Sequence, residues 1–224
     1  MDDILDEKRG DKTRRQLIEA AGWLFAEKGF AATSIRDICK RADVNIAAAH
    51  YHFGDKQKLY QAILEHCVEE DRKTFPLPVR AAKADAEKFL ADYICVILSR
   101  MTRTHQSEWR SALVNREMFT PSPEFVKFIS EKCIGPDIEA FSATFKSISP
   151  KASDEAIKTA VMSVIGMMGA YAMPVPLLKA TVPAQQLSLK QCEAIAQFIS
   201  RASVAGLLSI TGKPGHKSHP EEPS

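Results

Sequence analysis

Three side chains that can donate hydrogen bonds, His50, Tyr51 and His52, follow directly after a run of short apolar residues. The run spans residues 46–49, and Asn45 stands before it with a side-chain oxygen that suits the start of a helix. A helix with short side chains in its first turns can approach a grooved surface closely, and the donors behind them suit oxygen-rich groups. The chemistry that these residues offer is hydrogen bonding and apolar contact rather than bond making.

A second short helix is expected just before this one, over residues 34–41. Apolar side chains recur there three and four positions apart, and Thr33 and Ser34 both offer a capping oxygen. The turn between the helices is Asp43-Val44, where Asp tolerates a left-handed backbone less readily than Gly. Two short helices joined in this way predict a helix-turn-helix. A plain helical hairpin with an Ala-rich packing face is the alternative.

The stretch from Arg14 to Leu64 resembles the N-terminal DNA-binding domain of the TetR family of bacterial transcriptional regulators. The resemblance rests on blocks at unchanged spacing: Leu24-Phe25, the helix stop Gly29-Phe30, Thr33, the triplet Tyr51-His52-Phe53 and the helix start Lys56 to Leu59. Two positions depart from the pattern. Asp43 occupies the turn position that usually holds Gly, and His50 replaces the first of two aromatic residues, which alters an expected phosphate contact.

The resemblance implies that the chain binds a double-stranded DNA operator, with residues 46–53 as the recognition helix. Short side chains on that helix are expected at base edges, and the flanking donors and cations at phosphates. The expected DNA-binding residues are Thr33, Arg36, Asn45, Ile46, Ala47, Ala48, His50, Tyr51, His52 and Lys56. A dimer would read a near-palindromic site.

The charge distribution agrees with this assignment. The chain of 224 residues carries a net charge of only +2, yet residues 8–58 hold eleven Lys or Arg against six Asp or Glu. A locally basic segment in a nearly neutral protein suits phosphate contact, although a solvated face has the same composition. Five cysteines are widely scattered, and the polar first residues do not resemble a secretory signal, so reduced thiols in the cytoplasm are expected, with no membrane span.

Long apolar-periodic runs separated by Gly and Pro predict an all-α protein of about nine helices. Phe75-Pro76-Leu77-Pro78 interrupts the pattern, so the predicted domains are a helix-turn-helix domain over residues 12–74 and a helical effector-binding and dimerisation domain over residues 79–210. The helix over residues 56–74 is then the only expected connector. Residues 2–11 are expected to fray, and the polar, Pro-rich tail over residues 211–224 to be disordered.

The stretch Val114 to Pro123 resembles the C-terminal domain of the CecR/CerR-like subgroup of the same family, which implies an effector pocket among the middle helices and a dimer interface on the last two. Apolar residues on more than one side of the last two helices support a homodimer, while a single large core is the alternative. Aromatic and Met-rich candidates suggest a small apolar or aromatic effector, with Arg116 orienting an anionic group. The candidate residues are Tyr93, Ile97, Met101, Trp109, Leu113, Arg116, Met118, Phe125, Met168 and Tyr171.

Catalytic and metal-binding arrangements are not recognised in the sequence. His50 and His52 are two positions apart and face different sides of a helix, and no phosphate-binding Gly loop or nucleophile motif is present. The prediction is a ligand-responsive DNA-binding repressor without cofactor or metal. A helical enzyme or adaptor that uses the helix-turn-helix as a scaffold is the alternative.

Overall fold

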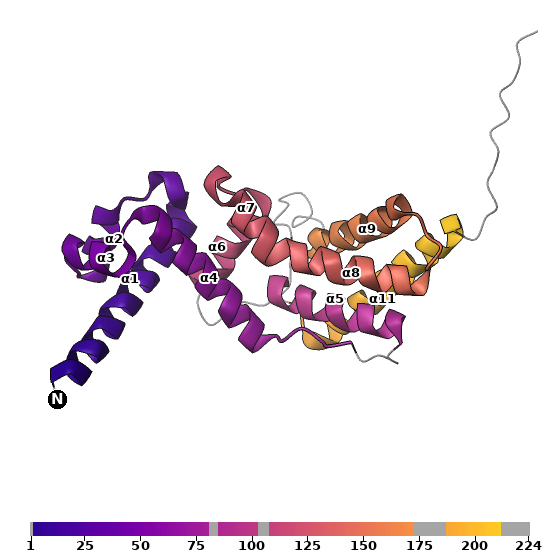
Figure 1. Cartoon of the computed structure of the whole chain (residues 1–224), viewed down its shortest axis with the longest axis horizontal. Helices are drawn as coiled ribbons and strands as arrows, with labels where there is room; N and C mark the ends of the chain where they lie inside the picture. Colours follow the sequence, from indigo (N-terminus) through magenta and orange to yellow (C-terminus); the bar gives the residue numbers. More distant parts are fainter. Residues whose placement is uncertain (1, 81–84, 103–107, 173–186, 212–224) are drawn as a thin grey trace, which may run out of the picture. The chain divides into compact units, whose positions relative to one another are not determined.

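The computed structural model describes residues 2–80, 85–102, 108–172 and 187–211, and every regular element in these ranges is a helix (Figure 1). The all-α fold class is therefore confirmed. Contacts divide the chain into two compact units, Met1–Pro76 with Arg103–Ile134, and Leu77–Thr102 with Gly135–Ser224. Of the tail expected from residue 211, Thr211 ends the last helix and residues 212–224 lie outside the described ranges.

Helix α1 (Asp2–Ala32) begins ten residues earlier than predicted, so the expectation of frayed residues 2–11 was wrong. Gly29 interrupts the helical backbone with φ 78° and ψ 173°, values that favour glycine. The predicted helix stop is therefore a kink, followed by one more turn.

Helices α2 (Ile35–Ala42), α3 (Ile46–Phe53) and α4 (Lys56–Thr74) follow the predicted helix-turn-helix closely. Each begins at a side-chain cap, provided by Ser34, Asn45 and Asp55. Asp43 between α2 and α3 adopts the left-handed conformation at φ 54°, which confirms the expected turn. Each cap satisfies one of the free N–H groups at its helix start, and the left-handed residue turns the chain from α2 into α3.

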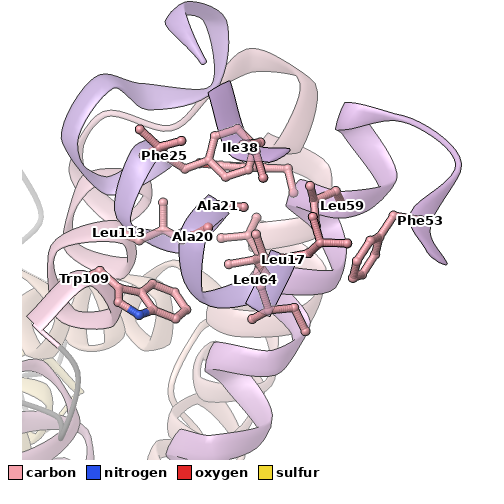
Figure 2. Packing of buried hydrophobic residues seen from close by; sticks show 14 of the residues in the cluster. Leu17, Ala20, Ala21, Phe25, Ile38, Phe53, Leu59, Leu64, Trp109 and Leu113 are labelled. Atoms are coloured by element: carbon pink, nitrogen blue, oxygen red, sulfur yellow. The ribbon is translucent and has the colours of Figure 1, made fainter. Parts of the chain in front are cut away.

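The first unit also contains α6 (Glu108–Phe119), a short 3-10 turn η1 (Pro123–Phe125), α7 (Val126–Ile129) and a π-helical segment η2 (Ser130–Ile134). Trp109 and Leu113 of α6 are fully buried with Leu17, Phe25 and other residues of the helix-turn-helix (Figure 2). Residues 108–134 were predicted to belong to the second domain. By contacts they complete the core of the first, because the apolar face of α6 packs on α1 and α4.

The second unit is built from α5 (Ala86–Thr102), α8 (Gly135–Ile148), α9 (Asp154–Ala172) and α11 (Leu189–Thr211). Its core gathers apolar side chains from all four helices, including Leu90, Phe141, Val164 and Ile199. The chain thus passes between the units three times, after Pro76, Thr102 and Ile134. The helix over residues 56–74 is consequently not the only connector, contrary to the prediction.

Within the described ranges, α11 is the one helix long and apolar enough to cross a membrane by length and composition, with a mean hydropathy of 1.3. The apolar residues of α11 lie on more than one face of the helix. One face packs on α5 and α9, burying Cys192, Ala196 and Ile199, and another lines a groove beside α9. Packing therefore explains part of this apolarity.

Candidate nucleic-acid interface

The outer face of α3 combines short apolar side chains with one very exposed aromatic ring. Ile46 is 42% exposed and Tyr51 86% exposed, while Ala47 and His50 are also at the surface. On the opposite face, Ala49 and Phe53 are buried against the rest of the first unit. Because these two residues anchor the helix, α3 presents a fixed set of side chains outward.

The cap of α3 determines what Asn45 can offer to a partner. Its side-chain oxygen accepts a hydrogen bond from the backbone N–H of Ala48 at 2.7 Å. Since Asn45 is exposed, its amide nitrogen remains at the surface as a donor. The first turn of α3 therefore carries a hydrogen-bond donor beside apolar groups.

The ring of His50 is oriented by the end of its own helix. Its Nδ1 atom lies 2.5 Å from the carbonyl oxygen of Gly54, and a carbonyl only accepts, so Nδ1 carries the proton. In a neutral ring the other nitrogen, Nε2, is then an acceptor and repels a phosphate oxygen. The structure therefore gives no support to the expected hydrogen bond from His50 to a phosphate.

One residue that was expected to contact DNA, Thr33, makes hydrogen bonds inside the protein instead. Thr33 is 2% exposed, and its hydroxyl donates to the carbonyl oxygens of Gly29 at 2.8 Å and Leu24 at 3.2 Å. Burial removes this hydroxyl from the surface, so the structure contradicts its assignment as a surface contact. Ser34, and not Thr33, caps α2 by accepting from the backbone N–H of Asp37 at 3.1 Å.

Lys56 is half-buried, and its ammonium group closes the end of α1. It donates to the carbonyl oxygens of Phe30 at 2.9 Å and Thr33 at 3.1 Å, and lies 4.3 Å from the centre of the Phe30 ring. An ammonium has three N–H donors, so one remains for an outside acceptor. Lys56 is therefore a structural residue first, which the sequence analysis missed because its partners lie more than twenty positions away.

Exposed cations lie on α1 and α2, the helices that precede α3. Arg36 and Lys40 of α2 are at the surface, and Arg14 of α1 stacks over the ring of Phe53 at 5.5 Å. His52 is half-buried beside Tyr51, with the two ring centres 5.3 Å apart. Thr33 apart, the predicted DNA-binding residues thus all reach the surface at least in part, and they come from α2, α3 and the start of α4.

The ten effector candidates do not fall in one unit. Trp109, Leu113, Arg116, Met118 and Phe125 belong to the first unit and the other five to the second. The Trp109 ring is fully buried and lies flat on α1, since a Cβ atom placed at Gly22 would come within 2.4 Å of it. The guanidinium of Arg116 covers Gly29 at the kink of α1. These positions differ from the expected pocket walls, because α6 packs on α1 as part of a core.

In the second unit, Tyr93, Ile97 and Met168 are buried among α5, α8, α9 and α11. The hydroxyl of Tyr93 donates to the carboxylate of Asp137 at 2.8 Å. Met101 is half-buried and Tyr171 is 46% exposed, each close to the last residue of its helix. Of these five candidates, only Met101 and Tyr171 therefore reach the surface, and the other three are core residues.

A buried carboxylate, Glu117, connects α6 with α4. Glu117 is 2% exposed and accepts hydrogen bonds from the Tyr60 hydroxyl at 2.5 Å and from the Ser122 hydroxyl and N–H at 2.9 and 3.0 Å. Burial first, and then the carboxylate, raise the pKa of Tyr60. The signal that could have identified it is a lone acid between apolar positions of α6.

The second unit carries exposed apolar side chains on its last two described helices. Met162 of α9 and Phe198, Leu208 and Ile210 of α11 are between 46% and 66% exposed. A groove of about 530 Å³ runs between α9 and α11, lined by small residues that include Gly166 and Gly206. Among the described residues, no group of three His, Cys, Asp or Glu side chains is placed to hold a metal ion.

Comparisons with known proteins match both parts of the chain. Residues 17–63 match the family model described as "Bacterial regulatory proteins, tetR family". Residues 86–208 match that of the C-terminal domain of the HTH-type transcriptional dual regulator CecR. The two models together cover most of both units.

Individual relatives agree with the family models. The chain is 52% identical over 50 residues to the HTH-type transcriptional repressor Rv3405c of Mycobacterium tuberculosis, covering 22% of this chain and 27% of that protein. It is 29% identical over 139 residues to the HTH-type transcriptional dual regulator CecR of Shigella flexneri, covering 57% and 60%. The matched stretch thus spans less than two thirds of either relative.

A solved structure shares the fold. The regulator AibR, in complex with isovaleryl coenzyme A and operator DNA, superimposes with a TM-score of 0.57 at 18% identity, covering 86% of this chain and 96% of that one. At this identity the likeness concerns the fold alone.

Proposed function

The chain belongs to the TetR family of bacterial regulatory proteins, and from this premise we propose that it is a DNA-binding transcriptional repressor released from its operator by a small molecule. The outer face of α3 carries the proposal. It leaves Tyr51 86% exposed beside short apolar side chains, and the preceding helices α1 and α2 carry exposed cations. Such a face suits base edges in the major groove and phosphates on either side of it.

Binding to DNA is tested by footprinting and gel shift on the DNA upstream of the protein's own gene. Ala47→Glu places a negative charge on the outer face of α3 and should abolish specific protection. Ala112→Glu makes the same change at an exposed position of α6 and should leave the footprint unchanged. An unchanged footprint with Ala47→Glu would place α3 outside the groove. Retention that does not weaken with salt would favour a non-DNA role for the helix-turn-helix.

The proposed assembly is a homodimer through α9 and α11. Met162, Phe198 and Leu208 are exposed apolar side chains that a second copy of the chain would bury. The groove between α9 and α11, which contains Gly166 and Gly206, would let helices of that copy approach closely. Two copies would present two α3 helices to a near-palindromic operator. The protein would act in the cytoplasm, where bacterial DNA lies.

The proposed effector is a small apolar or aromatic molecule bound in the second unit. We assign its contacts to Ile97 and Met101 of α5 and Met168 and Tyr171 of α9, because aromatic and Met side chains suit an apolar ligand and Met adapts to its shape. The relative AibR was solved with an acyl coenzyme A, which shows what that protein binds. Trp109 and Leu113 are assigned to the core of the first unit and no longer to the pocket.

Screening tests the effector proposal. A library of small aromatic and aliphatic compounds is assayed for a rise in Tm together with release of the protein from DNA. Tyr171→Ala changes a half-exposed residue and should weaken both effects without altering DNA affinity in the absence of compound. If Tyr171→Ala leaves both effects unchanged, the effector binds elsewhere.

A further inference from the structure

The identity of the base contacts follows from the chemistry that α3 can and cannot offer. This inference rests on the proposed function, in which α3 enters the major groove of the operator. The first turn of a recognition helix normally meets base edges. In α3 that turn begins with Asn45 as its cap and continues with Ile46, Ala47 and Ala48.

The cap fixes how Asn45 can meet a base. Its side-chain oxygen accepts from the N–H of Ala48 at 2.7 Å, so this oxygen points toward the helix and the amide hydrogens are the groups free to turn outward. The usual two-bond recognition of adenine by Asn needs both the oxygen and the nitrogen at the base edge. We therefore expect Asn45 to donate to thymine O4, guanine O6 or a purine N7.

The next residues have no polar side-chain atoms. Ile46 is 42% exposed and Ala47 is also at the surface, so their methyl groups form the part of α3 that faces outward. In the major groove the C5 methyl group of thymine is the apolar feature that distinguishes one base from the others. The helix itself contains no Arg or Lys that could read guanine with two hydrogen bonds.

The orientation of this apolar face is held on two sides. Ala49 at 3% exposure and Phe53 at 8% fix the opposite face of α3 in the core, and the Asn45 cap fixes its first turn. His50 and Tyr51 lie on the same outward face one turn further along α3, so the position along the helix, and not a rotation, separates them from Ile46 and Ala47. The apolar contact is therefore a property of the folded helix and not of one side-chain rotamer.

We propose that the operator half-site is recognised through thymine methyl groups contacted by Ile46 and Ala47, with Asn45 donating to an acceptor on a base edge beside them. Ile46 is then a specificity-determining residue. Because a two-fold dimer repeats the contact, each operator would offer several such methyl groups to the protein.

The experiment compares thymine with uracil, which has the same hydrogen-bonding edge and lacks the methyl group. The full-length protein is used to enrich binding sites from a random-sequence duplex pool, and the enriched pool is then amplified with either dTTP or dUTP. Each buried methyl is worth roughly fourfold in affinity, so a site with several should bind at least about tenfold more weakly when it contains uracil. The unselected pool should bind equally in both forms.

Two variants assign the effect to Ile46. Ile46→Ala removes an exposed side chain without touching the core, and should bring the thymine-to-uracil affinity ratio close to that of the unselected pool. Tyr51→Phe changes an expected phosphate contact and should weaken both forms of the pool alike while keeping their ratio.

Equal affinity of the wild-type protein for both forms of the enriched pool overturns the inference and leaves the proposed function standing. A ratio that persists undiminished in Ile46→Ala also overturns it, since the methyl groups would then be read by other residues. Failure to enrich any sequence, with no salt-dependent retention on DNA, overturns the proposed function itself.

Discussion

The ammonium group of Lys56 donates to the carbonyl oxygen of Phe30 at 2.9 Å while lying 4.3 Å from the centre of the Phe30 ring. The same group reaches the carbonyl oxygen of Thr33 at 3.1 Å. One cation at the start of α4 thus neutralises the carbonyl end of α1 at the point where the chain turns into α2. Lys56 holds the helix-turn-helix together, whatever it also does toward DNA.

Replacing Lys56 by Met should lower the free energy of unfolding by about 1–3 kcal/mol, because two carbonyl groups lose a charged donor and the Phe30 ring loses a cation. Chemical denaturation monitored by circular dichroism measures this. Lys58→Met is the matched control, since Lys58 is exposed and only 3.9 Å from the equally exposed Asp55. Equal stability of the two variants would contradict the structural role.

The DNA readout separates the two roles of Lys56. If its third N–H binds a phosphate, Lys56→Met should reduce the slope of log affinity against log salt by about one unit for all sequences alike. A loss of stability with an unchanged slope would leave Lys56 as a structural residue only. The slope is obtained from binding titrations at several salt concentrations, well below the denaturation temperature of the variant.

The contact between Gly22 and Trp109 predicts that replacing Gly22 by Ala lowers the stability of the protein, although the same change usually stabilises a helix. Gly to Ala inside a helix normally stabilises by about 1 kcal/mol. A Cβ atom at Gly22, however, would lie 2.4 Å from the buried ring of Trp109, so Gly22→Ala should destabilise and force α6 away from α1. Thermal unfolding measures the sign. A raised Tm for Gly22→Ala would mean that α6 does not pack on α1 as described.

The helix boundaries could be predicted because their signals are local. The side chains of Asn45 and Asp55 accept hydrogen bonds from backbone N–H groups three residues further on. The turn at Asp43 needs only the left-handed conformation of that one residue. Residues 2–11 were expected to fray because they lack an apolar stripe, although the Glu, Lys and Arg among them favour a helix intrinsically.

Residues of the candidate interface could be predicted from the sequence only where their role depends on being exposed. The outward position of Ile46 and Tyr51 follows from the helical periodicity that buries Ala49 and Phe53. The inward roles of Thr33 and Lys56 depend on carbonyl groups at the kink of α1, which no pattern of side chains reveals. Likewise, the apolar residues around Trp109 predict that α6 has a buried face, but they do not identify the helix on which that face packs.

The exposed ring of Phe198 on α11 predicts the effect of a charge on assembly. Phe198 is 66% exposed within one chain, and a Glu there would face a second copy across an apolar interface. Phe198→Glu should therefore shift the protein from dimer to monomer in sedimentation experiments and weaken operator binding in parallel. Val79→Glu makes a similar change at a residue 95% exposed outside α9 and α11, and should leave the dimer intact. A dimer that survives Phe198→Glu would place the interface elsewhere.

The pair His66 and Arg110 predicts that the fold loses stability in mild acid. Nε2 of His66 lies 3.1 Å from Nη2 of Arg110, and a guanidinium only donates, so His66 accepts with a neutral ring. Burial first, and then the charge of Arg110, lower the pKa of His66, while Glu70 and Glu69 act in the opposite direction and Arg14 adds to the lowering.

Because the folded pKa lies below the unfolded value of about 6.5, the unfolded chain binds the proton more readily. The contribution of His66 to stability is therefore complete above about pH 6.5 and is lost as the pH falls through its folded pKa. His66→Gln keeps an acceptor for Arg110 and cannot gain a proton. Denaturant titrations between roughly pH 5 and 8 should show a smaller loss of stability on acidification for His66→Gln than for the wild-type protein. Parallel curves for the two proteins would show that His66 is not the group that titrates.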